Sequence, residues 1–577
     1  MSEDLGLFNG KDKPTAETVW TFYQKGLVFN SAVNLDETVK SNENFFIGKQ
    51  WEGVQANGLP TPQFNILKRV VGFIVASITT DNIKVNATAL ANTPATDELV
   101  EPVRVVNEEM DALTEHNNIP SLLREFARNA AVDGDGCIYT YWDPDVDCGG
   151  GVKGAIKSEI TENTRVFFGN PNDRDVQSQP YIIISSREIV RNVKLRAKEN
   201  SADGWEQIKA DYDDSVSTDS AKYTDDKVTV LLTLWRSDED GEIWAYESTQ
   251  TCEVRKPWSL GIRLYPVCWL NWDYIRDCYH GQAMITGLIP NQIFINKAWA
   301  MSMLSIMRSA WPKVVYDKTR VSRWDNRVGG AIPAMGDPSN VAHIIDPAAI
   351  SPQVSQLIGL AVEQTEQSLG ATAVALGDTR PDNTSAIIAL QRAAATPSEM
   401  TKQNLYSAIE ELYRIYLEFM GQYYGRRKVD TEPPKQVADA MAFAGMDAPQ
   451  TVLMDFDFSI LKESPMMLKI DVGGSTYYSE IAAIQTLDRL WQAKGISTLQ
   501  YLERIPDSYM PGRRALIAEL KQQEAMQQAQ MQAMSMQAQP PAGGEEETIM
   551  GGYGQEPEIT GGRGYGAMQR AINNGEA

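Results

Sequence analysis

The segment that most constrains the fold is the loop Ala371–Ser385, which is rich in glycine, proline and asparagine and lies between two helical patterns. The first pattern covers Pro352–Leu369, and the second begins at Thr384 or Ser385, either of which can cap a helix running towards Tyr424. Pro397 lies inside the second pattern and predicts a kink there. A flexible loop between two long helices more often moves against a partner than supports a catalytic residue, so this segment points away from an enzyme.

The composition predicts a folded protein of several domains. The chain has 577 residues and a formal net charge of -23, and phosphate affinity depends on Lys and Arg. We therefore expect any contact with DNA to be weak. The best apolar run, Val70–Ile78, is too short to cross a bilayer, and the N-terminus lacks a signal peptide pattern. We expect no membrane segment, and reduced cysteines in a cytosolic setting.

The first half of the chain, up to about Cys278, has the pattern of an α+β fold. Residues 14–116 are mainly helical, with an extended interruption at Gly58–Pro62. Short runs rich in β-branched and aromatic residues follow, and Asp238–Gly241 predicts a hairpin turn. These predicted strands are Cys137–Trp142, Arg165–Phe168, Tyr181–Ser185, Val228–Trp235 and Ile243–Tyr246.

Leu288–Trp311 reads as a helix that is apolar on more than one face, and Pro312 ends it. Such a helix is normally buried among neighbours, and here those neighbours could be other copies of the chain. Lys313–Pro347 then reads as a compact insertion of strands and loops. Its basic residues could form a solvated mixed surface or a docking surface for a protein or a DNA backbone; they are Lys313, Lys318, Arg320, Arg323 and Arg327.

Two motifs only imitate ligand sites. Gly151–Ser158 resembles a phosphate-binding loop, but Ile156 stands where glycine must precede the lysine, so we interpret it as a flexible surface turn. Asp143–Asp147 resembles the start of a calcium loop, but Cys148 replaces the required glycine. The three histidines lie far in sequence from any plausible nucleophile. We therefore predict no catalytic residue, no metal site and no cofactor.

The order of these elements, with several local motifs, resembles the portal proteins of tailed bacteriophages. The motifs are Asn44–Trp51, Leu59–Asn65, Asp133–Gly136, Asn291–Asn296, Gly377 with Asn383–Ile387, and Asp471–Gly474. The resemblance covers roughly residues 15–525. It implies an α+β, multi-domain ring subunit with an α+β wing, a mainly helical stem, a long kinked helix and a helical crown.

The resemblance also implies a division of the chain. The wing is 1–283, the stem helix 284–312, the clip 313–350, the second stem helix 351–370, the tunnel loop 371–384, the long helix with the C-terminal part of the wing 385–470, the crown 471–525, and a low-complexity tail 526–577. The residues expected to face DNA in the tunnel loop are Leu376, Gly377, Asp378, Thr379, Arg380, Pro381, Asp382, Asn383 and Thr384. The clip residues that would dock partners are the five basic residues named above.

The implied function is a homo-oligomeric ring, commonly of twelve subunits, at one vertex of the capsid. Its implied partners are the terminase, the head-tail adaptor, the major capsid protein and double-stranded DNA that passes through with weak contacts. It would reside in the virion and, during assembly, in the host cytoplasm. Two alternatives stay open: another structural protein of the virion, such as an adaptor or internal head protein, and a packaging ATPase.

Overall fold

The computed structural model describes residues 14–54, 58–79, 83–89, 100–147, 153–211, 226–310, 313–325, 332–337, 339, 341–345, 352–367, 399–431, 452–462, 466–472, 487–493, 496–505, 516–517 and 520. The chain divides into two compact units, Met1–Glu480 and Ile481–Ala577. Each is described by itself.

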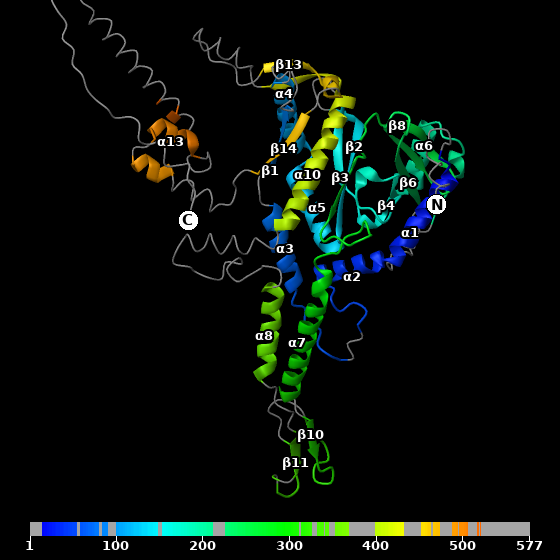
Figure 1. The fold of residues 1–577 in the computed structure, drawn as a ribbon. Helices are drawn as coiled ribbons and strands as arrows, with labels where there is room; N and C mark the ends of the chain where they lie inside the picture. The colour runs from blue at the N-terminus through cyan, green and yellow to red at the C-terminus, as the bar shows by residue number, and fades with distance from the viewer. Residues whose placement is uncertain are drawn as a thin grey trace, which may run out of the picture. The chain divides into compact units, whose positions relative to one another are not determined.

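The first unit is an α+β structure (Figure 1), as predicted. Its helices are α1 (Ala16–Ala32), α2 (Leu35–Ile47), α3 (Ile66–Thr79), α4 (Val100–His116), α5 (Ile119–Asp133), α6 (Val190–Glu199), α7 (Ile289–Ala310), α8 (Pro352–Gln367) and α10 (Glu399–Phe419). A π-helical turn, η9 (Met420–Tyr424), follows α10.

The strands form two larger antiparallel sheets. One has the order β3-β2-β9 and the other the order β4-β5-β6-β7-β8. The strands are β2 (Asp135–Asp147), β3 (Lys153–Ile160), β4 (Val166–Phe168), β5 (Tyr181–Ile189), β6 (Lys227–Arg236), β7 (Ile243–Ser248), β8 (Glu253–Ser259) and β9 (Val267–Asn271). The predicted turn at Asp238–Gly241 joins β6 to β7, which pair as a hairpin.

Three further antiparallel pairs complete the first unit. They are β1 (Ile83–Ala89) with β14 (Met466–Val472), β10 (Lys313–Tyr316) with β11 (Ala342–Ile345), and β12 (Arg426–Thr431) with β13 (Val452–Asp457). The first of these pairs joins segments that are far apart in the sequence, with Ile83 opposite Val472 and Ala89 opposite Met466.

The main core lies around α5, α10 and the three-stranded sheet. α5 places Phe126, Ala127 and Ala130 in it on helical spacing, and each is fully buried. A stripe of apolar side chains on α10 is likewise buried: Leu405, Ile409, Leu412, Tyr416 and Phe419. A second core forms where α1 packs on the five-stranded sheet, with Phe22 and Tyr23 against Tyr181 and Phe167.

The structure corrects one prediction about local structure. Residues 153–158 do not form a flexible surface turn; they belong to strand β3, where Ala155 and Ile156 are buried. Lys157, which imitated the phosphate-binding lysine, instead forms an ion pair with Asp143, with 2.5 Å between Nζ and Oδ2. This pair crosses from β3 to β2, so both imitation motifs contribute to the same sheet.

The second unit is described only in part. Residues 487–492 are helical, and α13 (Thr498–Arg504) begins with a capping box between Ser497 and Gln500. Trp491 stacks on Tyr501 at 5.3 Å between ring centroids. The predicted kink at Pro397, the loop 371–384 and the tail 526–577 lie outside the described residues.

Candidate functional site

The helix–hairpin–helix segment consists of α7, the β10–β11 hairpin and α8. α7 and α8 lie side by side (Figure 1), and near the base of α7 the Asn291 amide donates to Thr365 Oγ1 of α8 at 3.3 Å. α7 spans 289–310, within the predicted helix, and α8 begins at Pro352 as predicted. The order helix, hairpin, helix is therefore present in the structure.

Three of the motifs that resemble portal sequences meet at the base of α7. Buried amides connect them: Gln292 Nε2 donates to Phe64 O at 2.6 Å, and Ile66 N donates to Gln292 Oε1 at 3.2 Å. Asn296 Nδ2 donates to Gln50 Oε1 at 2.7 Å. We call Gln50, Gln292 and Asn296 the amide cluster.

The amide cluster is a specific anchor because its members are almost fully buried and bonded to one another. Gln50, Gln292 and Asn296 are 6%, 1% and 3% exposed, and Gln292 Nε2 also donates to Asn296 Oδ1 at 2.9 Å. Leaving a buried amide unpaired costs about 1–3 kcal/mol. The cluster therefore fixes α7 against the segment between α2 and α3, and sequence reasoning found its motifs but not their contact.

The outer part of α7 is largely uncovered in the single chain. Its exposed apolar side chains, with exposed fractions from 38% to 65%, are Phe294, Trp299, Met301, Met303, Ile306 and Met307. On α8, Leu357 and Leu360 are each 52% exposed. Several large apolar side chains exposed on one helix indicate an interaction surface. The described part of the single chain therefore does not bury these side chains, although a helix apolar on more than one face is normally buried among neighbours.

The hairpin has a small internal structure of its own. Asp317 Oδ1 accepts hydrogen bonds from Thr319 N and Oγ1, which lower the pKa of Asp317. Tyr316 stacks on Trp324 at 5.5 Å, and Val321 is buried. Of the basic residues predicted for docking, Lys318, Arg320 and Arg323 are exposed here; Lys313 begins β10, and Arg327 lies outside the described residues. Arg320 lies 3.6 Å from Asp317, so part of this charge is neutralised locally.

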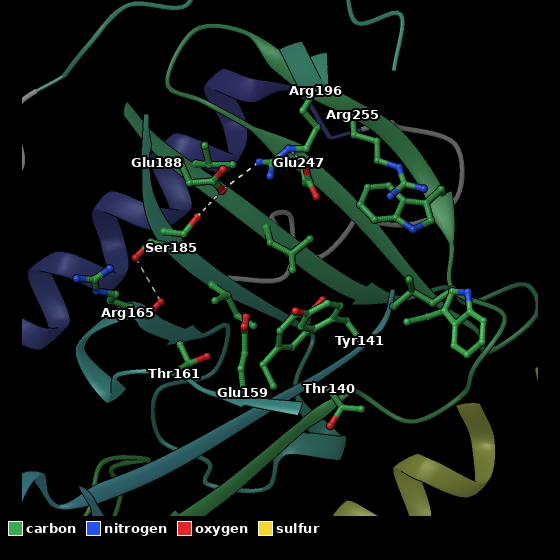
Figure 2. Close-up of a pocket in the computed structure, with 18 of the residues that line it drawn as sticks. Thr140, Tyr141, Glu159, Thr161, Arg165, Ser185, Glu188, Arg196, Glu247 and Arg255 are labelled. Carbon is green, nitrogen blue, oxygen red and sulfur yellow. Dashed lines mark hydrogen bonds and ion pairs between the residues drawn. The ribbon is translucent and has the colours of Figure 1, made fainter. Parts of the chain in front are cut away.

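A cavity of about 800 Å³ lies between the two larger sheets. Figure 2 shows Arg196 between Glu188 and Glu247 in this cavity. Arg196 Nη2 lies 3.1 Å from Glu188 Oε1, and Arg196 Nε lies 3.3 Å from Glu247 Oε2. Burial raises the pKa of Glu247 and of Glu159, and the Arg255 guanidinium lies 3.7 Å from the Trp258 ring centroid. Arg196, Glu188 and Glu247 thus form ion pairs within the cavity. The described lining of the cavity contains no histidine or cysteine.

Another of the motifs that resemble portal sequences, Asp133–Gly136, lies where α5 ends and β2 begins. Gly134 has φ +101°, and a Cβ there would lie 2.6 Å from the backbone oxygen of Gly281. The Asp135 carboxylate is fully buried and accepts from His280 Nδ1 at 2.8 Å, from Gly281 N at 2.6 Å and from Asn271 Nδ2 at 2.7 Å.

His280 has a structural place in this network. Its second ring nitrogen, Nε2, lies 3.2 Å from Asn30 Oδ1 of α1. Both ring nitrogens therefore have partners, and the side chain is 3% exposed, so His280 has no free nitrogen to offer a substrate as a general base.

The described residues show no group of three or more side chains suited to hold a metal ion. Within the same residues no helix combines the length and apolarity needed to cross a membrane.

Comparison with known proteins confirms the predicted resemblance. Residues 155–430 match the model of the phage P22-like portal protein family, a family of structural proteins of the virion. A chain of the solved structure titled "Virion of native gene transfer agent (GTA) particle" is similar at 10% identity, with 80% of this chain and 91% of that chain covered and a TM-score of 0.36. No curated protein sequence matches.

Proposed function

We propose that the chain is a portal subunit. In this proposal it forms a homo-oligomeric ring, with twelve subunits expected, at one vertex of a phage capsid. DNA passes through the ring during packaging and ejection, and the ring docks the terminase and later the head-tail adaptor. The match of residues 155–430 to the portal family is the observation that carries the proposal.

The uncovered apolar residues of α7 support ring formation. Met301 and Ile306 are 65% and 62% exposed, and full burial of such a side chain contributes about 1.5–3 kcal/mol. The amide cluster holds the base of α7 in place, so this surface is presented on a fixed helix. Neighbouring copies of the chain would cover it by a heterologous contact that closes into a ring.

Negative-stain imaging of the purified protein tests the ring. We expect rings with a central hole for the wild type and monomers for Met301→Glu/Ile306→Glu, because a charge cannot be buried unpaired in an apolar contact. Lys297→Glu is the matched control, since it changes the charge by the same amount on an exposed position of the same helix. Lattices, fibres or monomers of the wild type would contradict the proposal.

The loop 371–384 is proposed to face the DNA. Its residues Asp378, Arg380 and Asp382 nearly balance in charge, so phosphate contacts would be weak. A conduit needs this, because strong contacts would hold the DNA instead of letting it slide. Deleting Gly377–Asn383 should spare the ring and reduce packaging or retention of DNA. Normal genome filling by that variant would exclude this role.

The β10–β11 hairpin is proposed as the docking surface for the terminase and the adaptor. Its exposed Lys318 and Arg323 have no ion pair with a described residue, and Val315 and Met335 add apolar surface at 58% and 79% exposure. Charge reversal at Lys318 and Arg323 should reduce terminase-dependent packaging while rings still form. Loss of the rings themselves would instead assign these residues to assembly.

An adaptor or internal head protein is the second structural candidate. It would share the composition of this chain but would not need a helix–hairpin–helix segment with a tunnel loop. The imaging experiment distinguishes the two candidates. A packaging ATPase is the third, and ATP hydrolysis by the purified protein would favour it over the portal proposal.

A further inference from the structure

A second cleft, of about 770 Å³, lies beside α6 and has a different character from the cavity between the sheets. Its lining is Ile189, Val190, Arg191, Lys194, Leu195, Lys198, Trp205, Ile208, Lys209, Ala210 and Asp226. The floor is mainly aliphatic and aromatic, and the edge carries four cations against one carboxylate. We call it the basic cleft. It stands out in a chain whose formal net charge is -23.

The arrangement of α6 explains how this cleft is built. Val193 and Ala197 are buried on one face of the helix, in a small core with Val228 and Val254. Arg191, Lys194, Leu195 and Lys198 follow the spacing i, i+3, i+4, i+7, which places them together on another face. Leu195 is 51% exposed, as is Ile189 just before the helix. The face towards solvent thus combines apolar and cationic side chains.

The cations of the basic cleft are not neutralised by the described part of the chain. Arg196, on the same helix, pairs with Glu188 and Glu247, whereas Arg191, Lys194, Lys198 and Lys209 form no ion pair with a described residue; Lys198 Nζ lies 5.7 Å from the Trp205 ring centroid. Like charges at i, i+3 and i, i+4 destabilise a helix by roughly 0.2–0.5 kcal/mol per pair. α6 carries two such pairs, Arg191–Lys194 and Lys194–Lys198. An anionic partner would relieve this repulsion.

We propose that the basic cleft binds an acidic, amphipathic segment of a partner protein, in which two or more Asp or Glu residues flank a large apolar side chain. The apolar side chain fills the floor between Leu195 and Trp205, and the carboxylates meet Lys194 and Lys198 at the edge. A desolvated apolar anchor with charged residues around it is the usual anatomy of a specific protein interface. The proposal does not depend on the portal function.

Double-stranded DNA fits the same charges less well. Its backbone offers phosphates but no apolar group to occupy the floor of the cleft, and six apolar residues line the cleft. The net charge of the chain also repels DNA at long range. Complementarity of both charge and polarity therefore favours a polypeptide.

The test uses the full-length protein and a fluorescently labelled 12-residue peptide that alternates pairs of glutamate with leucine and phenylalanine. Fluorescence anisotropy should show saturable binding to the wild type. Lys194→Glu/Lys198→Glu should weaken it at least tenfold, and Leu195→Ser should weaken it severalfold. The control Lys49→Glu/Arg124→Glu changes the charge equally at exposed positions that do not line the cleft, and it should bind like the wild type.

Two further probes separate charge from shape. The same peptide with glutamine for glutamate, or with serine for leucine and phenylalanine, should bind much more weakly to the wild type. Circular dichroism on each variant checks that it is folded. Absence of peptide binding to the wild type, or equal weakening by the control, overturns the proposal. Tighter binding of a 20-base-pair duplex than of the peptide, lost in Lys194→Glu/Lys198→Glu, overturns it in favour of nucleic acid.

Discussion

Two aspartates at the junction of α5 and β2 have opposite environments although only Gly134 separates them. Asp135 accepts hydrogen bonds from His280, Gly281 and Asn271. Asp133 ends α5, where the helix dipole disfavours a negative charge. Burial is the main cause that raises the pKa of Asp133 to about 7; Arg128 opposes the rise, and nearby carboxylates, including Glu43, add to it.

Asp133 therefore makes stability depend on pH. Between its ordinary value of 3.8 and its folded value of about 7, the folded protein holds a proton that the unfolded chain has lost, so the free energy of unfolding falls as pH rises through this window. Asp133→Asn should flatten this slope. At pH 8 the free energy of unfolding of the variant should exceed that of the wild type by about 1–3 kcal/mol. The full rise in the pKa of Asp133 would correspond to about 4 kcal/mol. Urea denaturation at pH 4.5 and 8 measures this, with exposed Asp145→Asn as control.

Substitution of Asp135 should lower stability, in contrast to Asp133→Asn, which should raise it. Asp135→Leu removes the acceptor of four buried donor groups, on His280, Gly281, Asn271 and Asn163. We expect a loss of about 3–5 kcal/mol in the free energy of unfolding, measured by chemical denaturation at pH 7. Asp145→Asn in the same strand again serves as control. A loss below about 1 kcal/mol would show that water replaces the carboxylate.

At the scale of elements, the sequence predicts those helices and hairpins that depend on residues close to one another in the chain. The helix predicted at Leu288–Trp311 is present as α7, and the predicted turn at Asp238–Gly241 joins β6 to β7, because its turn residues lie between two strong strands. Strand β3 was missed because Gly151–Ser158 imitates a loop. Strands β1 and β14 were missed because their pairing depends on residues distant in sequence.

The candidate site was predictable only in part for the same reason. The motifs that contain Gln50, Phe64 and Gln292 are each recognisable in the sequence, but nothing in the sequence indicates that hydrogen bonds connect them. The sequence likewise does not indicate that the like-charged face of α6 lies beside Trp205. Long-range contacts of this kind follow from the packing of the whole unit.

The amide cluster should control how firmly α7 is held. Asn296→Leu removes the partner of Gln50 Oε1 and of Gln292 Nε2, and unpaired buried amides cost about 1–3 kcal/mol each. We expect faster amide hydrogen exchange across the base of α7 and a lower fraction of rings. Lys297→Ala, next to it on an exposed face, is the control. Unchanged exchange in Asn296→Leu would show that α7 is held by other contacts.

The β1–β14 pair can be tested by truncation. Ending the chain after Val472 keeps strand β14, whereas ending it after Lys462 removes it and uncovers Val85 and Ala87, which are buried. The shorter protein should lose several kcal/mol of stability, seen as a lower thermal midpoint. The longer truncation product should unfold near the wild-type midpoint if the first unit is independent. Equal midpoints for the two products would contradict the strand's role.

At the scale of the whole molecule, charge opposes assembly. Each chain brings a formal charge of -23, and copies that associate through α7 must bring these charges together. Salt screens such repulsion, with a Debye length that falls from about 30 Å at 0.01 M to about 10 Å at 0.1 M. The fraction of rings should therefore rise with NaCl concentration, measured by analytical ultracentrifugation. A fall with salt would indicate that ion pairs dominate the contact.

The pairing of β1 with β14 also sets an order of events during synthesis. Strand β1 leaves the ribosome early, but its partner strand β14 is complete only when Val472 has been translated. Strand β1 therefore has no pairing partner while the residues between them are synthesised. Contacts of such high sequence separation form late and slowly. A nascent chain therefore cannot complete the β1–β14 pair of its first unit before Val472 has been translated.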